Sequence, residues 1–125
     1  MDTSSRRPGR AWIITPGLRP ERFATAQKSG AAVAVVDIED SVAPRDKQAA
    51  RTAAQEFFAV PTAMCTLGIR MNSPLTIEGT RDLVAMASYT AKPDVIVVPK
   101  VESARDIELV AGVLDSDGYT PTSGP

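Results

Sequence analysis

Short apolar runs recur along the chain, each closed by charged residues or by a proline or glycine. Such runs predict buried strands of a parallel β-sheet. We expect strands over residues 11–15, 33–38, 65–71 and 94–98. The second run is apolar on both alternating faces until acidic residues begin, which is typical of a strand covered on both sides. The strand starts lie roughly 20 to 30 residues apart, the spacing of repeated β/α units.

Apolar residues at three- and four-residue spacing lie between these runs and predict helices. Pro20 and Pro44 can each occupy a first helical position, Gly30 can close the first helix in a left-handed cap, and Pro61 ends the second. The residues expected to face the core are Phe23, Ala26 and Gln27, then Ala49, Ala50, Ala53, Ala54, Phe57 and Phe58, and then Leu83, Met86 and Ala87. A fourth helix is expected after Ser103, where a serine and an acid three positions later resemble a capping box.

This alternation of strands and helices predicts an α/β fold with a parallel sheet, either doubly wound or a TIM-barrel-type (β/α) barrel. A complete barrel of eight units takes roughly 250 residues. The chain has 125 residues, so about four of the eight units are expected, as half a barrel over residues 10–114. Residues 1–9 are expected to form a flexible leader and residues 115–125 a linker or truncated end.

Composition excludes several classes of function. Lys and Arg number 14 against 15 Asp and Glu, so no excess positive charge favours nucleic acid. Histidine is absent, and acid–base chemistry would fall to carboxylates, Lys, Tyr or a metal-bound water. Cys65 is the single cysteine, which excludes an internal disulfide and predicts a packed, small apolar residue. No apolar stretch suits a signal peptide or membrane span, so we expect a cytoplasmic protein without membrane partners.

Functional groups are concentrated where the four predicted strands end. The strand ends read Thr15-Pro16-Gly17, Asp37-Ile38-Glu39-Asp40, Arg70-Met71-Asn72 and Pro99-Lys100-Val101-Glu102. Because the carboxyl ends of parallel strands form one rim, these groups are expected to converge on a single site. The glycine-rich dinucleotide fingerprint, the P-loop and the serine-hydrolase elbow are all absent from the sequence. The chain is therefore interpreted as part of an enzyme acting on a small molecule.

Three acids lie within four positions at the end of the second predicted strand. Strand alternation places Asp37 and Glu39 on one side and Asp40 on the other. Carboxylates this close repel one another unless a cation or metal-bound water lies among them. They could hold a hydrated Mg²⁺ or polar substrate groups. Equally, Asp40 or Ser41 could cap the next helix while Asp37 pairs with an Arg or Lys of a neighbouring strand.

Arg70 lies at the end of the third predicted strand. Its planar guanidinium could bind a substrate carboxylate through two parallel hydrogen bonds, or form a structural ion pair with Glu39 or Asp40. Asn72 would add a neutral donor and acceptor at the rim. Gly17 would allow a ligand to approach the backbone closely.

Lys100 follows Pro99 at the end of the fourth predicted strand. It could form a Schiff base or act as a positive clamp on an anion, because burial lowers the pKa of a lysine. No apolar pocket around it is evident from the sequence, so a clamp or a pairing with Glu102 is favoured.

Four segments, in this order along the chain, carry a family resemblance. They are W-I-I-T-P-G-L-R-P-E-R-F at 12–23, A-V-V-D-I-E-D-S-V-A-P-R-D-K-Q-A-A-R at 34–51, I-R-M-N-S-P at 69–74 and V-V-P-K-V-E-S-A-R-D at 97–106. Together they resemble the citrate lyase β-subunit family, within the wider HpcH/HpaI aldolase and citrate lyase group. The resemblance covers only the first half of that family's fold.

The resemblance implies a TIM barrel that makes or breaks a carbon–carbon bond β to an acyl-CoA or acyl-carrier thioester. A 2-keto acid such as oxaloacetate or glyoxylate is released or consumed, with Mg²⁺ as cofactor. The family role carried by Arg70 is binding of the keto acid's carboxylate, and Glu39 and Asp40 would lie beside the metal's water ligands. Asp37, Lys100 and Glu102 would support these groups.

The resemblance also implies which residues this sequence lacks. The family's direct metal ligands are a glutamate in a segment like E-T-A-R/P-G on the fifth strand and an aspartate on the sixth. Neither segment occurs here. Asp115 and Asp117 are present but do not replace them, so the sequence carries half a site.

Three hypotheses follow. The favoured one is a carbon–carbon lyase whose activity needs residues beyond these 125 or a partner chain. Half a barrel has unpaired strand edges and an incomplete core, so self-association into a homo-oligomer is expected. The second is a non-catalytic relative that serves as an assembly or binding partner. The third is a receiver-like flavodoxin-fold domain, which would need a phosphorylatable aspartate where this chain has Arg70.

Overall fold

Four parallel strands form one sheet in the order β1-β2-β3-β4. The computed structural model describes residues 11–60 and 65–99. The strands are β1 (Trp12–Pro16), β2 (Val33–Asp37), β3 (Thr66–Arg70) and β4 (Val95–Val97). All four predicted strands are confirmed, with no end moved by more than one residue.

The helical segments lie between the strands, as predicted. They are η3 (Pro20–Arg22), α1 (Phe23–Gln27), η4 (Pro44–Asp46), α2 (Lys47–Ala59) and α3 (Ile77–Ser88). Each proline that was expected to start a helix starts a 3₁₀ turn instead, and the α-helix begins three residues later. Gly30 has the predicted positive φ of 91°. However, α1 ends at Gln27, so Gly30 lies in the loop beyond the helix and does not close it.

The core lies between the sheet and the helices. On α2 the buried apolar positions are Ala50, Ala54, Phe57 and Phe58. Ala49 was expected on this face but is exposed, because consecutive helical residues point about 100° apart and Ala50 takes the inward position. Edge-to-face aromatic contacts join Phe57 to Phe58 and to Phe23 of α1, with ring centres about 5 Å apart.

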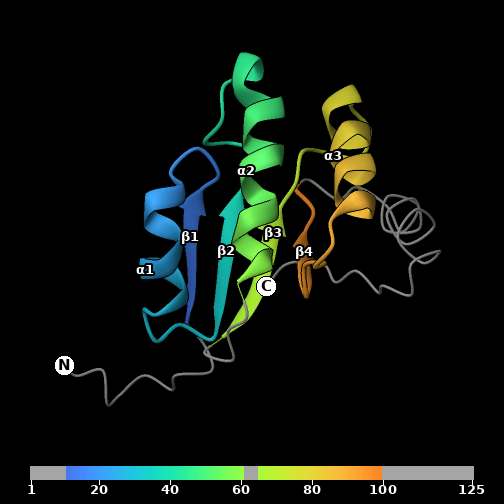
Figure 1. Ribbon diagram of the computed structural model, residues 1–125. Helices are drawn as coiled ribbons and strands as arrows, with labels where there is room; N and C mark the ends of the chain where they lie inside the picture. The colour runs from blue at the N-terminus through green and yellow to red at the C-terminus, as the bar shows by residue number, and fades with distance from the viewer. Residues whose placement is uncertain (1–10, 61–64, 100–125) are drawn as a thin grey trace.

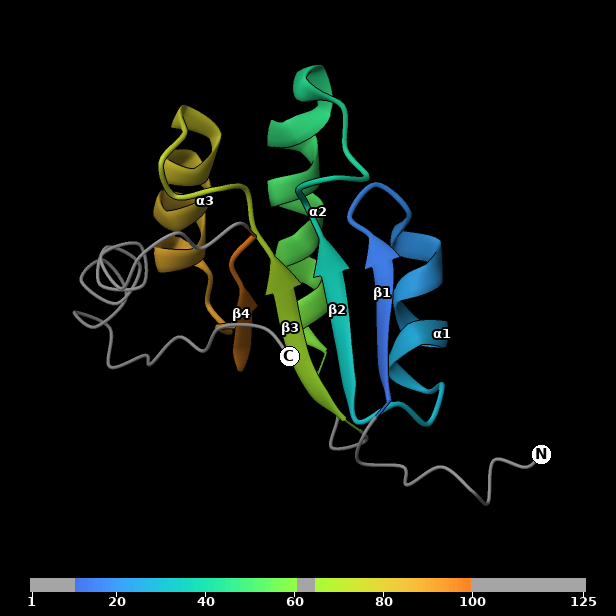
Figure 2. The ribbon, with the colours of Figure 1, turned by 180° about the vertical axis from the view of Figure 1, so that it is seen from behind.

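The helices cover one side of the sheet. Figures 1 and 2 view the molecule from opposite sides, and α2 passes in front of the strands in the first and behind them in the second. Right-handed crossovers between strands taken in sequence order place every helix on the same side. A doubly wound or receiver-like sheet would change order at the first strand and carry helices on both sides. The described strands therefore have the connectivity of consecutive units of a (β/α) barrel.

Several predictions fall outside the described residues. These are the leader at 1–9, the helix end at Pro61, the helix after Ser103, the segment 115–125, and the side chains of Lys100 and Glu102. Within 11–60 and 65–99, none of the helices combines the length and apolar character needed to cross a bilayer.

Candidate functional site

Asp37 and Arg70 form a two-pronged ion pair at the carboxyl end of the sheet. Parallel register sets these residues side by side at the ends of β2 and β3. Arg70 Nε donates to Asp37 Oδ1 at 2.9 Å, and Arg70 Nη2 donates to Asp37 Oδ2 at 2.9 Å. The predicted pairing of Asp37 with an arginine of the neighbouring strand is therefore confirmed. The alternative cap by Asp40 or Ser41 is wrong, because Ala43 and Asp46 are the N-caps of η4 and α2.

The pair lies on the side of the sheet away from the helices. Pro16, Asp37, Arg70 and Val97 share one row across the four strands. The preceding positions of β2, β3 and β4 belong to the helix-covered core, and successive strand residues point to opposite sides. In a barrel, the side away from the helices is the interior, so the ion pair faces the place where barrel enzymes bind their substrates.

Asp37 is held by the turn that follows it as well as by Arg70. Its Oδ1 accepts from Glu39 N at 3.0 Å, and its Oδ2 accepts from Ser41 N at 2.9 Å. Burial alone would raise the pKa of Asp37, but the hydrogen bonds from Arg70, Ser41 and Glu39 outweigh it and lower the pKa to about 2. Asp37 is therefore ionised at neutral pH, and its oxygens are occupied within the protein.

Arg70 keeps part of its binding capacity. The hydrogen bond with Asp37 raises its pKa, so the guanidinium stays charged. Asp37 occupies the Nε–Nη2 edge, whereas Nη1 makes no hydrogen bond to any described residue. The side chain is 28% exposed, compared with 1% for Asp37. A buried carboxylate thus orients an accessible guanidinium that still has donors for an anionic ligand.

Glu39 lies beside this guanidinium, and Asp40 follows it in the same turn. Glu39 Oε1 is 3.7 Å from Arg70 Nε. The charges of both acids contribute to the raised pKa of Arg70, and Asp40 is exposed. The sequence analysis expected the acids of the second strand and the arginine of the next to converge, and the structure brings Asp37 and Glu39 to Arg70.

The described residues at this rim do not form a cluster that could hold a metal ion on its own. No group of three or more His, Cys, Asp or Glu side chains suited to a metal occurs within 11–60 and 65–99. Asp37 is already occupied by Arg70 and two backbone N–H groups. Glu39 and Asp40 supply carboxylate oxygens, which suit an Mg²⁺ ion that retains several of its waters.

Asn72 does not reach the opening. It is buried, and its Nδ2 donates to Ile38 O at 3.0 Å and to Asp82 Oδ2 at 2.7 Å. Its backbone N donates to the same oxygen of Asp82. The amide group therefore ties the end of β3 to the end of β2 and to α3.

Gly17 is in close contact with the protein's own backbone. Its N–H donates to Asp37 O at 2.8 Å. A Cβ at this position would lie 3.1 Å from that oxygen and 3.2 Å from the side chain of Ile38. The close approach expected here is made by the end of β2.

Three residues of this region were missed by the sequence analysis. Lys47 is buried and donates to Ile38 O and Glu39 O, and Arg51 and Asp82 form a buried ion pair behind the rim. Asp82 carried a signal, because it stands four residues before Met86 on the buried face of an amphipathic helix. Lys47 carried none, since lysine at the first turn of a helix is normally solvated.

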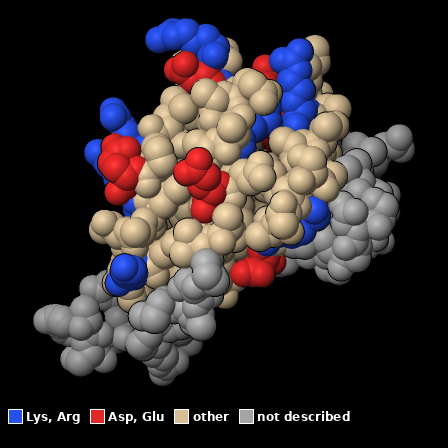
Figure 3. Space-filling model, viewed as in Figure 1, with Lys and Arg blue, Asp and Glu red and all other residues tan. Residues whose placement is uncertain are grey.

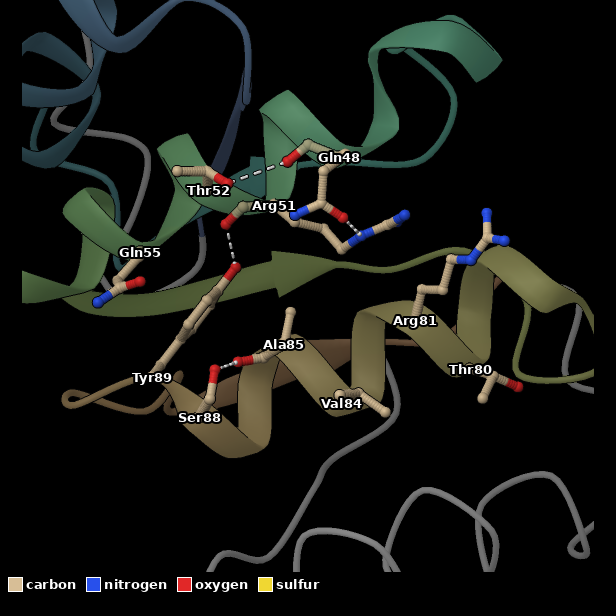
Figure 4. A pocket seen from close by; sticks show the side chains of 10 residues that line it. All are labelled: Gln48, Arg51, Thr52, Gln55, Thr80, Arg81, Val84, Ala85, Ser88 and Tyr89. Atoms are coloured by element: carbon tan, nitrogen blue, oxygen red, sulfur yellow. Dashed lines mark hydrogen bonds between the residues drawn. The ribbon is translucent and has the colours of Figure 1, made fainter.

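A groove of about 390 Å³ lies between α2 and α3, on the helix-covered side (Figure 4). Three of its hydroxyl groups donate to main-chain carbonyls of the same two helices. Thr52 Oγ1 donates to Gln48 O, Ser88 Oγ to Ala85 O, and Tyr89 Oη to Arg51 O. Because these hydroxyl groups are already bonded to main-chain carbonyls, the groove is not taken as the candidate site.

Charged side chains of both signs are scattered over the helix side of the molecule (Figure 3). None gathers into a broad patch of one sign there. Electrostatic arguments about this face therefore concern local pairs, not a long-range field.

Comparison with known proteins places the chain in a family. The family model described as HpcH/HpaI aldolase/citrate lyase matches residues 10–118. The chain belongs to this family. It is 38% identical over 104 residues to a citrate lyase subunit beta-like protein of Mycobacterium tuberculosis, covering 82% of this chain and 35% of the relative.

Two further relatives agree. An L-malyl-CoA/beta-methylmalyl-CoA lyase of Cereibacter sphaeroides is 36% identical over 106 residues, covering 83% of this chain and 33% of the relative. The solved structure of the citrate lyase beta subunit of M. tuberculosis complexed with oxaloacetate and magnesium superposes with a TM-score of 0.68 at 34% identity, covering 83% and 45% of the two chains. The fold is thus of the TIM-barrel type. The chain spans about a third of the length of the curated relatives it matches.

Proposed function

We propose that this chain supplies the keto-acid-binding rim of a carbon–carbon lyase of the citrate lyase β or malyl-CoA lyase type. Such an enzyme cleaves or forms a 3-hydroxyacyl thioester of CoA or an acyl carrier, releasing or using a 2-keto acid, with Mg²⁺. One observation carries the proposal. A guanidinium with spare donors is fixed by a buried carboxylate beside Glu39, on the face that becomes the interior of a barrel.

Each rim residue has a distinct role in this proposal. Arg70 binds the carboxylate of the keto acid through the donors that Asp37 leaves unused, because a fixed guanidinium loses little entropy on binding. Glu39 and Asp40 accept hydrogen bonds from the waters of a hydrated Mg²⁺. When bound, the metal supplies positive charge that stabilises developing charge on the keto acid's oxygen.

The remaining residues support this rim. We assign Asp37 to orienting Arg70, and Gly17 and Asn72 to holding the ends of β1 and β3 against β2, because their donors bond its carbonyls. Lys100 and Glu102, outside the described residues, are proposed to support the site from the fourth strand.

The relatives support the substrate classes. One relative is named for malyl-CoA, a CoA thioester, and the superposed structure holds oxaloacetate and magnesium. Because this chain spans about a third of those relatives, the complete reaction needs further residues, from the same polypeptide or from a partner. We propose a cytoplasmic homo-oligomer, since β1 and β4 end the described sheet with unpaired edges. Elution from gel filtration as a monomer would contradict this assembly.

Calorimetric titration with oxaloacetate in the presence of Mg²⁺ tests the proposed function. Wild-type chain is expected to bind, and Arg70→Lys to bind at least tenfold more weakly, because lysine cannot make paired bonds to Asp37 and the ligand together. Arg81→Lys is the matched control. Arg81 pairs with Glu78 on the outer surface of α3, so its replacement should change the affinity less than twofold.

A second candidate function is a non-catalytic partner for a complete relative. The lack of a direct metal-ligand cluster within 11–60 and 65–99 favours it. Failure of the wild-type chain to bind oxaloacetate with Mg²⁺ in every oligomeric state would favour this candidate over the lyase.

A further inference from the structure

A buried lysine lies beneath the turn that carries the two rim acids. Lys47, the first residue of α2, is 8% exposed. Its Nζ donates to Glu39 O, and more weakly to Ile38 O at 3.4 Å. A charged ammonium is costly to remove from water. Its burial at this point, with its donors on main-chain carbonyls of one turn, calls for an explanation beyond packing.

We propose that Lys47 is a positioning residue, whose ammonium fixes the backbone of the Ile38–Glu39–Asp40 turn so that the Glu39 carboxylate stays beside Arg70. This role deepens the proposed function, on which it rests. Lys47 itself touches neither substrate nor metal in this account. It acts through the two carbonyls that it holds.

Several hydrogen bonds hold this turn, but apart from Lys47 the carbonyl of Glu39 has only a weak one. Asp37 accepts from the amides of Glu39 and Ser41. Ile38 O also accepts from Asn72 Nδ2 at 3.0 Å. By contrast, the other described donor to Glu39 O is the amide of Val42, at 3.3 Å.

Removal of the ammonium should therefore loosen the carbonyl of Glu39 more than that of Ile38. Because the Glu39 side chain leaves the same residue, its 3.7 Å approach to Arg70 would be lost with the backbone geometry. The two amides that donate to Asp37 would also become easier to open. The consequence is local to the rim.

Lys92 provides a control for the loss of a lysine that bonds main-chain carbonyls away from the rim. Its Nζ also donates to two carbonyls, those of Ala87 at 3.0 Å and Tyr89 at 2.6 Å. Ala87 lies in the last turn of α3 and Tyr89 directly follows that helix, at the amino end of β4 and away from the rim. Both lysines donate to main-chain carbonyls, and they differ in which end of the sheet those carbonyls belong to.

The test compares Lys47→Met with Lys92→Met in the full chain. Amide hydrogen exchange is measured by NMR at Glu39 and Ser41, with Ile69 in the inner strand β3 as the reporter of global unfolding. Lys47→Met is expected to accelerate exchange at Glu39 and Ser41 at least tenfold more than at Ile69. Lys92→Met is expected to change the ratio of exchange at Glu39 and Ser41 to exchange at Ile69 by less than twofold.

Affinity for oxaloacetate with Mg²⁺ is measured on the same proteins. Lys47→Met should bind about tenfold more weakly, with Lys92→Met close to wild type. Equal acceleration at all three amides in Lys47→Met would overturn the positioning role and leave Lys47 as a stabilising residue. If the wild type binds no oxaloacetate, the proposed function fails, whereas amide exchange still decides whether Lys47 fixes the turn.

A measurement on wild-type protein covers the case in which Lys47→Met does not fold. The Nζ resonance of Lys47 should show slowed hydrogen exchange and a coupling to the carbonyl carbon of Glu39. An ammonium that exchanges as fast as that of exposed Lys28 would contradict the proposal.

Discussion

Two arginines of this chain are each paired with carboxylates, yet they serve different ends. Arg51 is 3% exposed and bonds Glu78 at 2.7 Å and Asp82 at 2.9 Å, joining α2 to α3. Arg70 is 28% exposed and bonds one buried carboxylate, that of Asp37. The Arg51 guanidinium is buried and bonded by both of its partners, whereas Arg70 keeps donors on an accessible side. The difference separates a structural ion pair from a candidate binding group.

The acids of the two pairs differ as well. Burial raises the pKa of Asp82, although Asn72 and Arg51 oppose this shift. Burial acts in the same direction on Asp37, but bonds from Arg70 and the following turn lower its pKa to about 2. Both acids are almost fully buried. The comparison shows that the rim holds its carboxylate firmly in the charged form, as orientation of a binding guanidinium requires.

The largest expected effect concerns the enclosed pair. Asp82→Ala leaves the Arg51 guanidinium buried without this partner and frees Asn72, so the free energy of unfolding should fall by about 3–5 kcal/mol. Glu78→Ala removes a partner that is 29% exposed, and should cost about 1 kcal/mol. Urea unfolding followed by circular dichroism measures both. A loss below about 1 kcal/mol in Asp82→Ala would show that the pair is not enclosed as described.

Acidification should change the contributions of Asp37 and Asp82 to the free energy of unfolding in opposite directions. The folded pKa of Asp37 lies below its ordinary value of 3.8. Its stabilising contribution is therefore present above pH 3.8 and lost as the pH falls toward 2. This contribution amounts to about 2 kcal/mol. The raised pKa of Asp82 has the opposite sign, because the cost of its charge is relieved on acidification.

Urea midpoints measured between pH 5 and pH 2 test this difference. Asp37→Asn should flatten the loss of stability below pH 4, whereas the wild type should show it in full. If the urea midpoint of Asp37→Asn fell with pH as steeply as that of the wild type, another group would be responsible for the acid sensitivity.

A smaller effect is expected from crowding at the rim. Gly17→Ala places a Cβ 3.1 Å from Asp37 O, which should shift the end of β2 and cost about 1–2 kcal/mol in stability. The affinity for oxaloacetate with Mg²⁺ should fall as well. Val84→Ala, at an exposed position of the groove between α2 and α3, should leave both unchanged. If Gly17→Ala bound oxaloacetate as tightly as the wild type, the end of β2 would not be part of the binding site.

The smallest effect on stability is expected at Glu39. Glu39→Gln removes a partly exposed charge 3.7 Å from Arg70, and should change the free energy of unfolding by less than about 0.5 kcal/mol. Its effect should appear in ligand binding, as a loss of the enhancement by Mg²⁺. Calorimetry with and without the metal measures it. If Mg²⁺ enhanced oxaloacetate binding by Glu39→Gln as much as by the wild type, Glu39 would not lie near the metal.

Much of the fold could be predicted from the sequence because strand and helix periods are local properties. The apolar run of β2 and the spacing of Ala50, Ala54 and Phe57 on α2 indicate their structures directly. The error at Ala49 arose because alanine fits either face of a helix, and only packing decides between them. The 3₁₀ turns at Pro20 and Pro44 could not be predicted either, since a proline at a first helical position is compatible with both a 3₁₀ and an α turn.

The candidate site was predictable to the level of which strand ends meet. Register places Asp37 beside Arg70, but the sequence left open whether this arginine paired with Asp37, Glu39 or Asp40. The contacts that hold the rim depend on long-range geometry. Asn72 turns inward toward Asp82 and Ile38, and no local pattern distinguishes an inward amide from one that faces the opening.

The most direct test of the central claim maps the ligand by NMR. Oxaloacetate is titrated with Mg²⁺ into isotopically labelled wild-type chain, and the backbone amides and arginine Nε–H signals are followed. Shifts should concentrate at Arg70 Nε and the amides of residues 39–41, with those of the groove between α2 and α3 unchanged. Saturable shifts confined to Arg51 and the groove, with Arg70 unaffected, would contradict the assignment of the rim as the binding site.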